Sequence, residues 1–193
     1  MGSIDDSAAL RRKWDRRHRE AEGAPEAALV LRDNRHLLPA RGTALDLACG
    51  RGGNALLLAD AGLDVHAWDL SPVAIEALEA RAHPRIRAEP RDVIAHPPEA
   101  DGFDVIVVSY FLHRPLMPRL TAALRPGGLL FYETFGPRYA GIGPERKDFR
   151  LADNELPGLL PGLRLRCYRD EADCGDLSRG FRDRVMLVGQ RPG

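Results

Sequence analysis

The sequence predicts a doubly wound α/β domain with helices on both faces of a mostly parallel, seven-stranded sheet and an antiparallel strand at its C-terminal end. Strand patterns alternate with helical patterns from residue 43 onward, as in a parallel sheet. The strongest strand pattern, residues 103–111, is apolar on both faces, which is typical of a central parallel strand. Two strand patterns near the C-terminus lack a long helix between them, which favours an antiparallel hairpin.

Each element follows from a local signal. The strand patterns cover residues 43–48, 64–69, 85–92, 103–111, 129–135, 163–171 and 182–190. The helical patterns cover residues 54–62, 71–82 and 116–128. Gly62 lies just past the end of the first helix, and Ser71 with Pro72 provides an N-cap and a first helical residue for the second. Pro126 and the two glycines after it are expected to stop the third helix.

Composition limits the classes of function. The 193 residues are expected to form one domain, with residues 1–40 as an N-terminal helical cap and residues 41–193 as the core. Twenty-eight basic residues balance twenty-eight acidic ones, which disfavours binding to nucleic acid or an anionic membrane.

Targeting and metal signals are also weak. We find neither an apolar run long enough to span a bilayer nor a signal-peptide pattern. The three cysteines form no C-x-x-C pair and the six histidines have no metal-ligand spacing, so we expect a cytoplasmic protein without a metal.

The most distinctive stretch is "LDLACGRGGN", residues 45–54. Gly50, Gly52 and Ala55 satisfy the G-x-G-x-x-G/A pattern of a nucleotide-binding turn, although such turns also join strands to helices for geometric reasons alone. Ligands of doubly wound sheets bind beyond the carboxyl ends of the strands. The side chains expected there are Asp46, Asp69, Asp92 and Ser109.

Two acidic residues indicate what the turn holds. Asp69 lies 19 residues after Gly50, close to the spacing of an acid that binds ribose hydroxyls, so we expect a nucleoside. Asp46 precedes the turn and is expected to direct its carboxylate toward it. A carboxylate near a phosphate costs on the order of several kcal/mol, which disfavours a dinucleotide and favours a ligand with a sulfonium or ammonium group.

These motifs resemble those of class I S-adenosylmethionine-dependent methyltransferases, a family with a Rossmann-like fold. "LDLACGRGG" resembles their first motif, "AWDLSP" the acidic end of their second strand, "PRDV" their adenine-contacting turn and "LRPGGLLFYETF" the segment leading into their fifth strand. "WDRRHRE" and "DLACGRGGNALLLA" resemble the tellurite-resistance and thiopurine-type branch, which acts on small molecules. In the tellurite-type pattern a His-Arg pair precedes the last strand, whereas Ser178 and Arg179 stand here.

The resemblance implies a role for each matching position. Gly50 and Gly52 would let the backbone approach the methionine part of the cofactor. Asp46 would help to hold the amino end of the cofactor, and Asp69 would bind the ribose hydroxyls. Asp92 would accept the adenine amine. The implied cofactor-binding residues are Trp14, Arg17, Asp46, Ala48, Gly50, Gly52, Asn54, Asp69, Leu70, Asp92, Val93, Ser109 and Tyr110. Tyr110 and His113 are the candidate catalytic residues.

Structural explanations compete with several of these roles. Leu70 and Val93 are expected to sandwich the adenine, but apolar residues of this kind also serve as ordinary core residues. Trp14 could likewise only pack its helix onto the sheet. Cys49 is expected to be a small buried residue rather than a nucleophile. His113 either faces the acceptor as a general base or caps the following helix, and we favour the second.

The acceptor is the least determined part of the prediction. An anionic acceptor could be held by Arg146, Arg150, Arg179, Arg182 and Arg184. The N-terminal helix, the loop after Tyr110 and the irregular stretch 136–149 are expected to select the acceptor.

The sequence thus predicts methyl transfer from S-adenosyl-L-methionine to a small thiol, metalloid oxyanion or similar acceptor, leaving S-adenosyl-L-homocysteine. The alternatives are a nicotinamide-dependent oxidoreductase and a non-catalytic protein that binds S-adenosylmethionine. We expect neither a nucleic acid nor a membrane as a partner, and the oligomeric state is left open.

Overall fold

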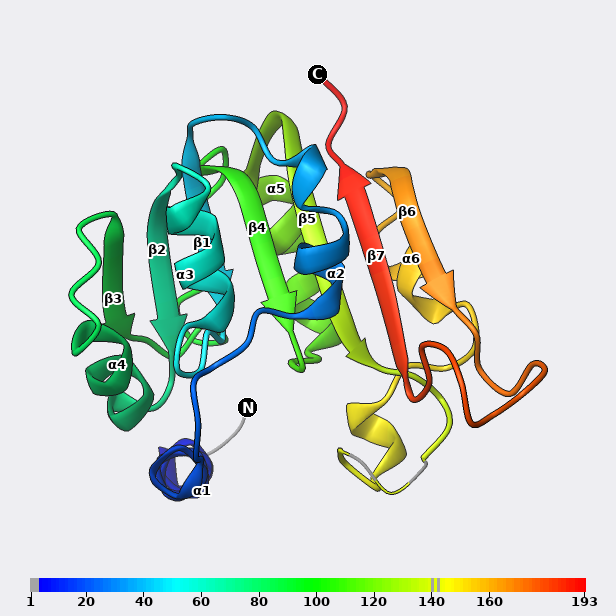
Figure 1. Ribbon diagram of the computed structural model, residues 1–193, viewed down its shortest axis with the longest axis horizontal. Coiled ribbons are helices and arrows are strands. Elements are labelled where there is room, and N and C mark those ends of the chain that lie inside the picture. The colour runs from blue at the N-terminus through cyan, green and yellow to red at the C-terminus, as the bar shows by residue number, and fades with distance from the viewer. Residues whose placement is uncertain (1–3, 140, 142) are drawn as a thin grey trace.

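A computed structural model describes residues 4–139, 141 and 143–193, with side chains from residue 7 onward. In this part of the chain, seven strands form one sheet, as expected, and their order across it is β3-β2-β1-β4-β5-β7-β6 (Figure 1). The strands are β1 Thr43–Leu47, β2 Asp64–Asp69, β3 Ile86–Pro90, β4 Phe103–Ser109, β5 Leu124–Phe135, β6 Arg164–Asp170 and β7 Arg184–Gln190. The pairs among β1 to β5 are parallel, and β7 is antiparallel to both β5 and β6.

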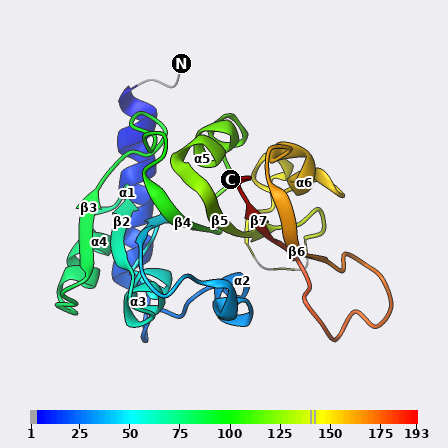
Figure 2. The same cartoon turned by 90° about the horizontal axis from the view of Figure 1, so that it is seen from above.

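Helices cover both faces of this sheet. The α-helices are α1 Ile4–Glu20, α2 Leu29–Asp33, α3 Gly53–Asp60, α4 Pro72–Glu79, α5 Met117–Ala123 and α6 Glu155–Leu159. Short 3-10 turns cover Arg35–Leu37, Arg114–Leu116 and Lys147–Phe149. Figure 2 shows α2 and α3 on one side of the sheet and α5 and α6 on the other. The doubly wound prediction is therefore confirmed.

Each face of the sheet has its own core. Val107 and Phe131 belong to the core on the side of α2, α3 and α4. Ile106 and Leu130 belong to the core on the side of α5 and α6. Successive residues of β4 and β5 thus alternate between the two cores, and all four are fully buried, which is why the β4 pattern is apolar on both faces.

Local signals explain most helix boundaries. Ser71 adopts an extended conformation at the N-cap of α4 and its side chain accepts a hydrogen bond from Ala74 N at 3.3 Å. Gly62, two residues past the end of α3, has a φ of +99°, which glycine adopts without strain.

The end of α5 differs from the prediction. The helix stops at Ala123 rather than near Pro126, and β5 begins at Leu124. Leu124 is extended and pairs with Phe103 of β4. Because the residue before a proline is itself disfavoured in a helix, Arg125 favours the extended path that this strand pairing completes.

The N-terminal segment lies at the edge where the parallel strands end. Figure 1 shows α1 end-on beneath the arrowheads of β1 and β2. Ser71 donates a hydrogen bond to Asp15 at 2.5 Å, which joins α1 to the start of α4. The guanidinium of Arg51 donates to the carbonyls of residues 21–23 at 2.8–3.0 Å and holds the segment that follows α1. Among the described residues, no helix is both long and apolar enough to cross a membrane.

Candidate functional site

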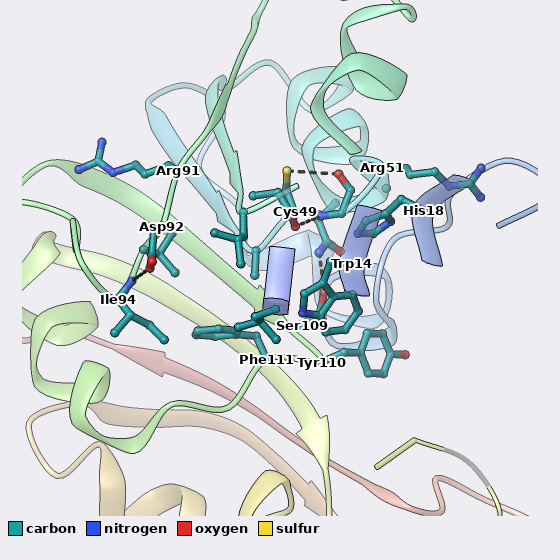
Figure 3. A pocket seen from close by; sticks show the side chains of 18 of the residues that line it. Trp14, His18, Cys49, Arg51, Arg91, Asp92, Ile94, Ser109, Tyr110 and Phe111 are labelled. Carbon is teal, nitrogen blue, oxygen red and sulfur yellow. Dashed lines mark hydrogen bonds between the residues drawn. The ribbon is translucent and has the colours of Figure 1, made fainter. Parts of the chain in front are cut away.

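A cavity of about 620 Å³ opens between the carboxyl edge of the sheet and α1. Its walls come from α1, the segment after it, the turns that follow β1, β2 and β3, and the residues after β4. In Figure 3, Asp92 and Ile94 lie on one side of this cavity, His18 and Arg51 lie on the other, and Trp14 stands between them. The predicted crevice therefore exists as a partly open site.

The glycine turn lines this cavity with its backbone. Gly50 N donates to Asp69 Oδ2 at 2.8 Å, and Gly52 has a φ of +84° at the N-cap of α3. A Cβ on Gly52 would lie 2.3 Å from a methyl carbon of Leu78, so Gly52 permits the packing of α3 on α4. A Cβ on Gly53 would lie 2.3 Å from the carbonyl oxygen of Glu26. Gly50 and Gly53 line the cavity, whereas Gly52 supports the turn from below.

Asp46 points toward the turn but is completely buried beneath it. Its oxygens accept from Ala55 N at 2.9 Å and from Asn54 Nδ2 at 3.3 Å, and it does not line the cavity. Burial raises the pKa of Asp46 to about 7, while the bonds from Asn54 and Ala55 act in the opposite direction. Asp46 is therefore not placed to repel a phosphate as expected, because its carboxyl group is buried beneath the turn and its raised pKa favours the neutral form.

Asp69 and Asp92 both line the cavity. Asp69 Oδ1 accepts from Ser71 N at 2.8 Å while Oδ2 accepts from Gly50 N, so the carboxylate is fixed between two turns. Asp92 Oδ1 accepts from the backbone amides of residues 94 and 95, and its Oδ2 accepts from Ser7 of α1 at 3.2 Å. Leu70 and Val93, the residues that follow these aspartates, line the cavity as well.

Helix α1 covers the cavity with Trp14 and His18, whose rings stack with centroids 6.0 Å apart. Burial lowers the pKa of His18, so its imidazole is neutral at neutral pH. Arg17 does not line the cavity; its guanidinium lies 5.2 Å from the centroid of the Trp14 ring. The structure thus brings Trp14 to the predicted site but leaves Arg17 at its outer side.

Ser109 and Tyr110 form the wall beyond the end of β4. Asn54 Nδ2 donates to Ser109 Oγ at 3.0 Å, and Asn54 Oδ1 accepts from Ala28 N at 2.8 Å. Asn54 therefore joins the glycine turn, the end of β4 and the segment after α1. Ala48 also lines the cavity, in a left-handed conformation with a φ of +57°.

Tyr110 is held by two groups on neighbouring strands. Its hydroxyl donates to Glu133 Oε1 of β5 at 3.1 Å and accepts from Arg184 Nη1 of β7 at 2.9 Å. Burial and the nearby Glu133 raise the pKa of Tyr110, so its phenol stays protonated at neutral pH. Tyr110 therefore cannot serve as an ionised base there.

His113 and Cys49 differ in their relation to the cavity. His113 lies outside its lining, at the N-cap of the turn Arg114–Leu116, where its side chain makes no capping hydrogen bond. Burial lowers its pKa. Cys49 lines the cavity but is buried, and burial raises its pKa well above the usual range. The Cys49 thiol is thus protonated and unsuited to nucleophilic attack.

The five candidate arginines lie outside the cavity lining. Arg150 is 3% exposed and donates to the carbonyls of Gly136 at 2.7 Å and Pro144 at 3.1 Å, so it organises the 136–149 stretch, of which residues 140 and 142 lie outside the described part. Arg182 donates to carbonyls of the β6–β7 connection. Arg179 is exposed in that connection, as is Ser178.

Several lining residues were missed by the sequence argument. They are Ser7, Leu10, His18, Pro25, Glu26, Arg51, Gly53, Arg91, Ile94, Ala95 and Phe111. Those near Asp92 could have been found by extending the predicted turn after β3. Those of residues 7–26 carry no local signal, because their place over the cavity depends on how α1 docks.

Residues 44–128 match a family described as "Methyltransferase domain". This part of the chain, from β1 into β5, is thus similar to a methyltransferase domain.

Solved structures agree on the fold. An S-adenosylmethionine-dependent methyltransferase from Mesorhizobium loti is 20% identical, with 86% of this chain and 99% of that one covered and a TM-score of 0.67. TehB from Haemophilus influenzae is 20% identical, with 93% and 67% covered and a TM-score of 0.69. SpnF, a cyclase, is 18% identical, with 90% and 85% covered and a TM-score of 0.67. At these identities the likeness shows the fold, and SpnF shows that one fold serves different reactions.

A curated relative matches part of the chain. Hemagglutinin 1 of Eikenella corrodens is 40% identical over 94 residues, which cover 44% of this chain. The match spans 31% of the length of that protein.

The polar groups that line the cavity suit S-adenosylmethionine, the cofactor that the sequence resemblance implies. Asp69 and Asp92 present carboxylates that suit hydroxyl and amino groups, and the backbone of Gly50 faces the cavity without a side chain. A Cβ on Gly50 would meet His18 Cε1 at 3.4 Å, so any side chain there would fill the space between the turn and α1.

Proposed function

We propose that this protein transfers a methyl group from S-adenosylmethionine to a small-molecule acceptor whose body is apolar and uncharged. The observation that carries the proposal is the cavity itself. Its volume of about 620 Å³ lies within the range of roughly 300–1,000 Å³ typical of small-molecule sites. Helix α1 covers it, which disfavours a macromolecular acceptor reaching the same space.

Aromatic and aliphatic side chains support an apolar acceptor. Leu10, Trp14, Tyr110 and Phe111 all line the cavity. Leu10 and Tyr110 remain 41% and 45% exposed, as does Ile94 at 47%, so the entrance is apolar too. Apolar surface of this kind favours a ligand that loses water contact on binding.

Charge argues against an anionic acceptor body. Among the described residues that line the cavity, three carboxylates (Glu26, Asp69, Asp92) face two guanidinium groups (Arg51, Arg91), a formal charge of −1 with His18 neutral. Arg51 is bonded to three carbonyls, and Arg91 stacks on Trp68 with 3.8 Å to the ring centroid while it donates to Glu89. Both guanidinium groups of the described lining are therefore already engaged, and a tellurite or selenite ion would have to displace one of these partners to form an ion pair.

The residues would then act by binding and orientation. Bound S-adenosylmethionine supplies an activated methyl group for in-line displacement by the acceptor. We propose that Asp69 and Asp92 hold the nucleoside part, that Gly50 admits the methionine part, and that Trp14 excludes water. Orientation of this kind contributes roughly 7–11 kcal/mol of barrier reduction. A thiol acceptor loses its proton to water and attacks as the thiolate, with S-adenosylhomocysteine as the leaving group, so no strong general base is required in the cavity.

We also propose that residues 1–40 act as a cap that closes over the bound cofactor. Arg51 and Asn54 support this proposal, because both reach from the glycine turn to the segment after α1. A non-catalytic binding protein would use the same contacts but would show no turnover.

A matched pair of thiols tests the proposed acceptor. S-adenosylhomocysteine binding is first measured by calorimetry, and methyl transfer is then followed to phenylmethanethiol and to 4-(sulfanylmethyl)benzoate, which adds one carboxylate. We expect kcat/KM to be about tenfold or more higher for the neutral thiol, which corresponds to about 1.4 kcal/mol. A preference for the benzoate or for tellurite would contradict the acceptor class, and absent S-adenosylhomocysteine binding would contradict the function.

A further inference from the structure

Glu133 is a carboxylate in the interior of the sheet, with an exposed fraction of 0%. Its Oε1 accepts from the hydroxyl of Tyr110 at 3.1 Å and from Arg184 Nη1 at 2.8 Å. Its Oε2 accepts from Val30 N, in α2, at 2.8 Å. Three donors from three separate segments thus meet on one buried carboxylate beside the cavity.

Stability alone does not account for this charge. Removing a carboxylate from water costs several kcal/mol, and apolar side chains of similar volume in place of a buried ion pair often give equal or greater stability. Its two neighbours in β5, Tyr132 and Thr134, are also buried and carry no charge. The buried carboxylate is therefore better explained by the residues that it holds in place.

Tyr110 is the partner that lines the cavity, and Glu133 holds it at both ends. The backbone carbonyl of Glu133 accepts from Tyr110 N at 2.8 Å, and its side chain accepts from the Tyr110 hydroxyl. Tyr110 has a φ of +57°, a left-handed conformation that costs roughly 1–2 kcal/mol for a residue with a Cβ. Figure 3 shows the hydroxyl of Tyr110 directed away from Ser109 and Phe111, and Tyr110 lines the cavity together with these two residues.

We propose that Glu133 is a positioning residue for methyl transfer. It holds Tyr110 in a backbone conformation that would otherwise relax. The ring of Tyr110 then forms the wall against which the acceptor lies. Val30 N anchors the carboxylate, and Arg184 balances its charge while bonding the same hydroxyl. The inference rests on the proposed function, because it assigns the wall to the acceptor.

Glu133→Gln tests this role with little change in volume. The amide oxygen can still accept from Val30 N, but the amide NH2 then faces the donors of Arg184 and Tyr110. Asp104→Asn is the matched control, because Asp104 also accepts from one arginine and one backbone amide, Arg125 and Thr43 N, at the amino end of the sheet. Tyr110→Phe is the second variant, which keeps the ring and removes the hydroxyl.

Two readouts are measured on the full chain. We expect Glu133→Gln to lower kcat/KM for phenylmethanethiol about tenfold, equivalent to about 1.4 kcal/mol, with the Kd for S-adenosylhomocysteine changed by no more than about twofold. Tyr110→Phe should lower kcat/KM as well, and the double variant should be no slower than Glu133→Gln, because both changes break one contact. Amide hydrogen exchange should accelerate at Tyr110 in Glu133→Gln and not in Asp104→Asn.

The outcomes separate this inference from the proposed function. Unchanged exchange at Tyr110 and unchanged kcat/KM in Glu133→Gln would overturn the positioning role. Equal losses in Asp104→Asn, or additive losses in the double variant, would overturn it as well. Failure of the wild-type protein to bind S-adenosylhomocysteine would instead contradict the proposed function, and the exchange at Tyr110 would still decide whether Glu133 holds that residue.

Discussion

At the scale of single residues, the carboxylates near the glycine turn differ in their surroundings. Asp69 and Asp92 line the cavity and accept backbone hydrogen bonds, whereas Asp46 lies wholly buried beneath the turn. The spacing of acids along the sequence predicted that all three would gather at one edge of the sheet. Which of them meets a ligand depends on how α3 packs, since Ala55 and Asn54 of that helix cover Asp46.

Asp69→Ala should weaken the binding of S-adenosylhomocysteine by about 1–3 kcal/mol, the cost of removing a charged acceptor from a buried hydrogen bond. Isothermal calorimetry on the wild-type and variant proteins measures this directly. Asp69→Asn, which keeps one acceptor oxygen for the amide of Gly50 or Ser71, separates loss of the ligand contact from loosening of the turn. Unchanged affinity in Asp69→Ala would remove Asp69 from the ribose role.

The raised pKa of Asp46 predicts a pH-dependent stability. Its folded pKa of about 7 lies above the unfolded value, so its contribution to stability is fully present below the unfolded pKa and is lost as pH rises through the folded pKa. Relative to Asp46→Asn, the wild-type protein should therefore lose about 2 kcal/mol of unfolding free energy between about pH 5 and about pH 8. Urea unfolding of both proteins across that range measures the difference in unfolding free energy. The contribution of the histidines is common to both proteins and cancels in this difference. A difference that does not change with pH would contradict the raised pKa of Asp46.

At the scale of elements, caps and strand pairing decide where helices begin and end. Ser71 and Pro72 predicted the start of α4 correctly because an N-cap is a local interaction within one turn of chain. The end of α5 was predicted wrongly because Leu124 pairs with Phe103, a contact between residues far apart in the sequence. Helix α1 depends on a similar long-range contact, the hydrogen bond from Ser71 to Asp15.

Ser71 therefore has two separable effects. Ser71→Ala should lower the free energy of unfolding by about 1 kcal/mol, since α4 loses its side-chain cap. Asp15→Ala should leave that free energy near the wild-type value but release α1, so that the segment after α1 is cleaved faster in limited proteolysis. Urea unfolding and proteolysis of both variants measure the two effects, and equal loss of stability in both would show that α1 is part of the cooperative core.

At the scale of the whole molecule, the sheet supplies stability and its carboxyl edge supplies the site. The two cores lie on its two faces, while α1 packs mainly against α4 at that edge. A cap built in this way contributes little to either core. It contributes instead to the enclosure of the cavity, through Ser7, Trp14 and His18.

Removal of residues 1–20 should therefore leave a cooperatively unfolding protein with its near-ultraviolet circular dichroism retained. Because the cavity loses its cover, we expect the affinity for S-adenosylhomocysteine to fall about tenfold or more, equivalent to at least about 1.4 kcal/mol. Circular dichroism and calorimetry on the shortened chain measure both. Loss of cooperative unfolding would contradict the separation of cap and core, and wild-type affinity would contradict the proposed role of α1 as a cover.

The sequence by itself determined the sheet, the order of its elements along the chain and the position of the glycine turn. Periodicity, caps and glycines act over a few residues, so "LDLACGRGGN" and Asp69 could be read without a fold. Only the tertiary structure decided that Asp46 is buried, that Arg17 lies outside the cavity and that Glu133 meets Tyr110, Val30 and Arg184. These contacts join segments up to 103 residues apart, and no local pattern records them.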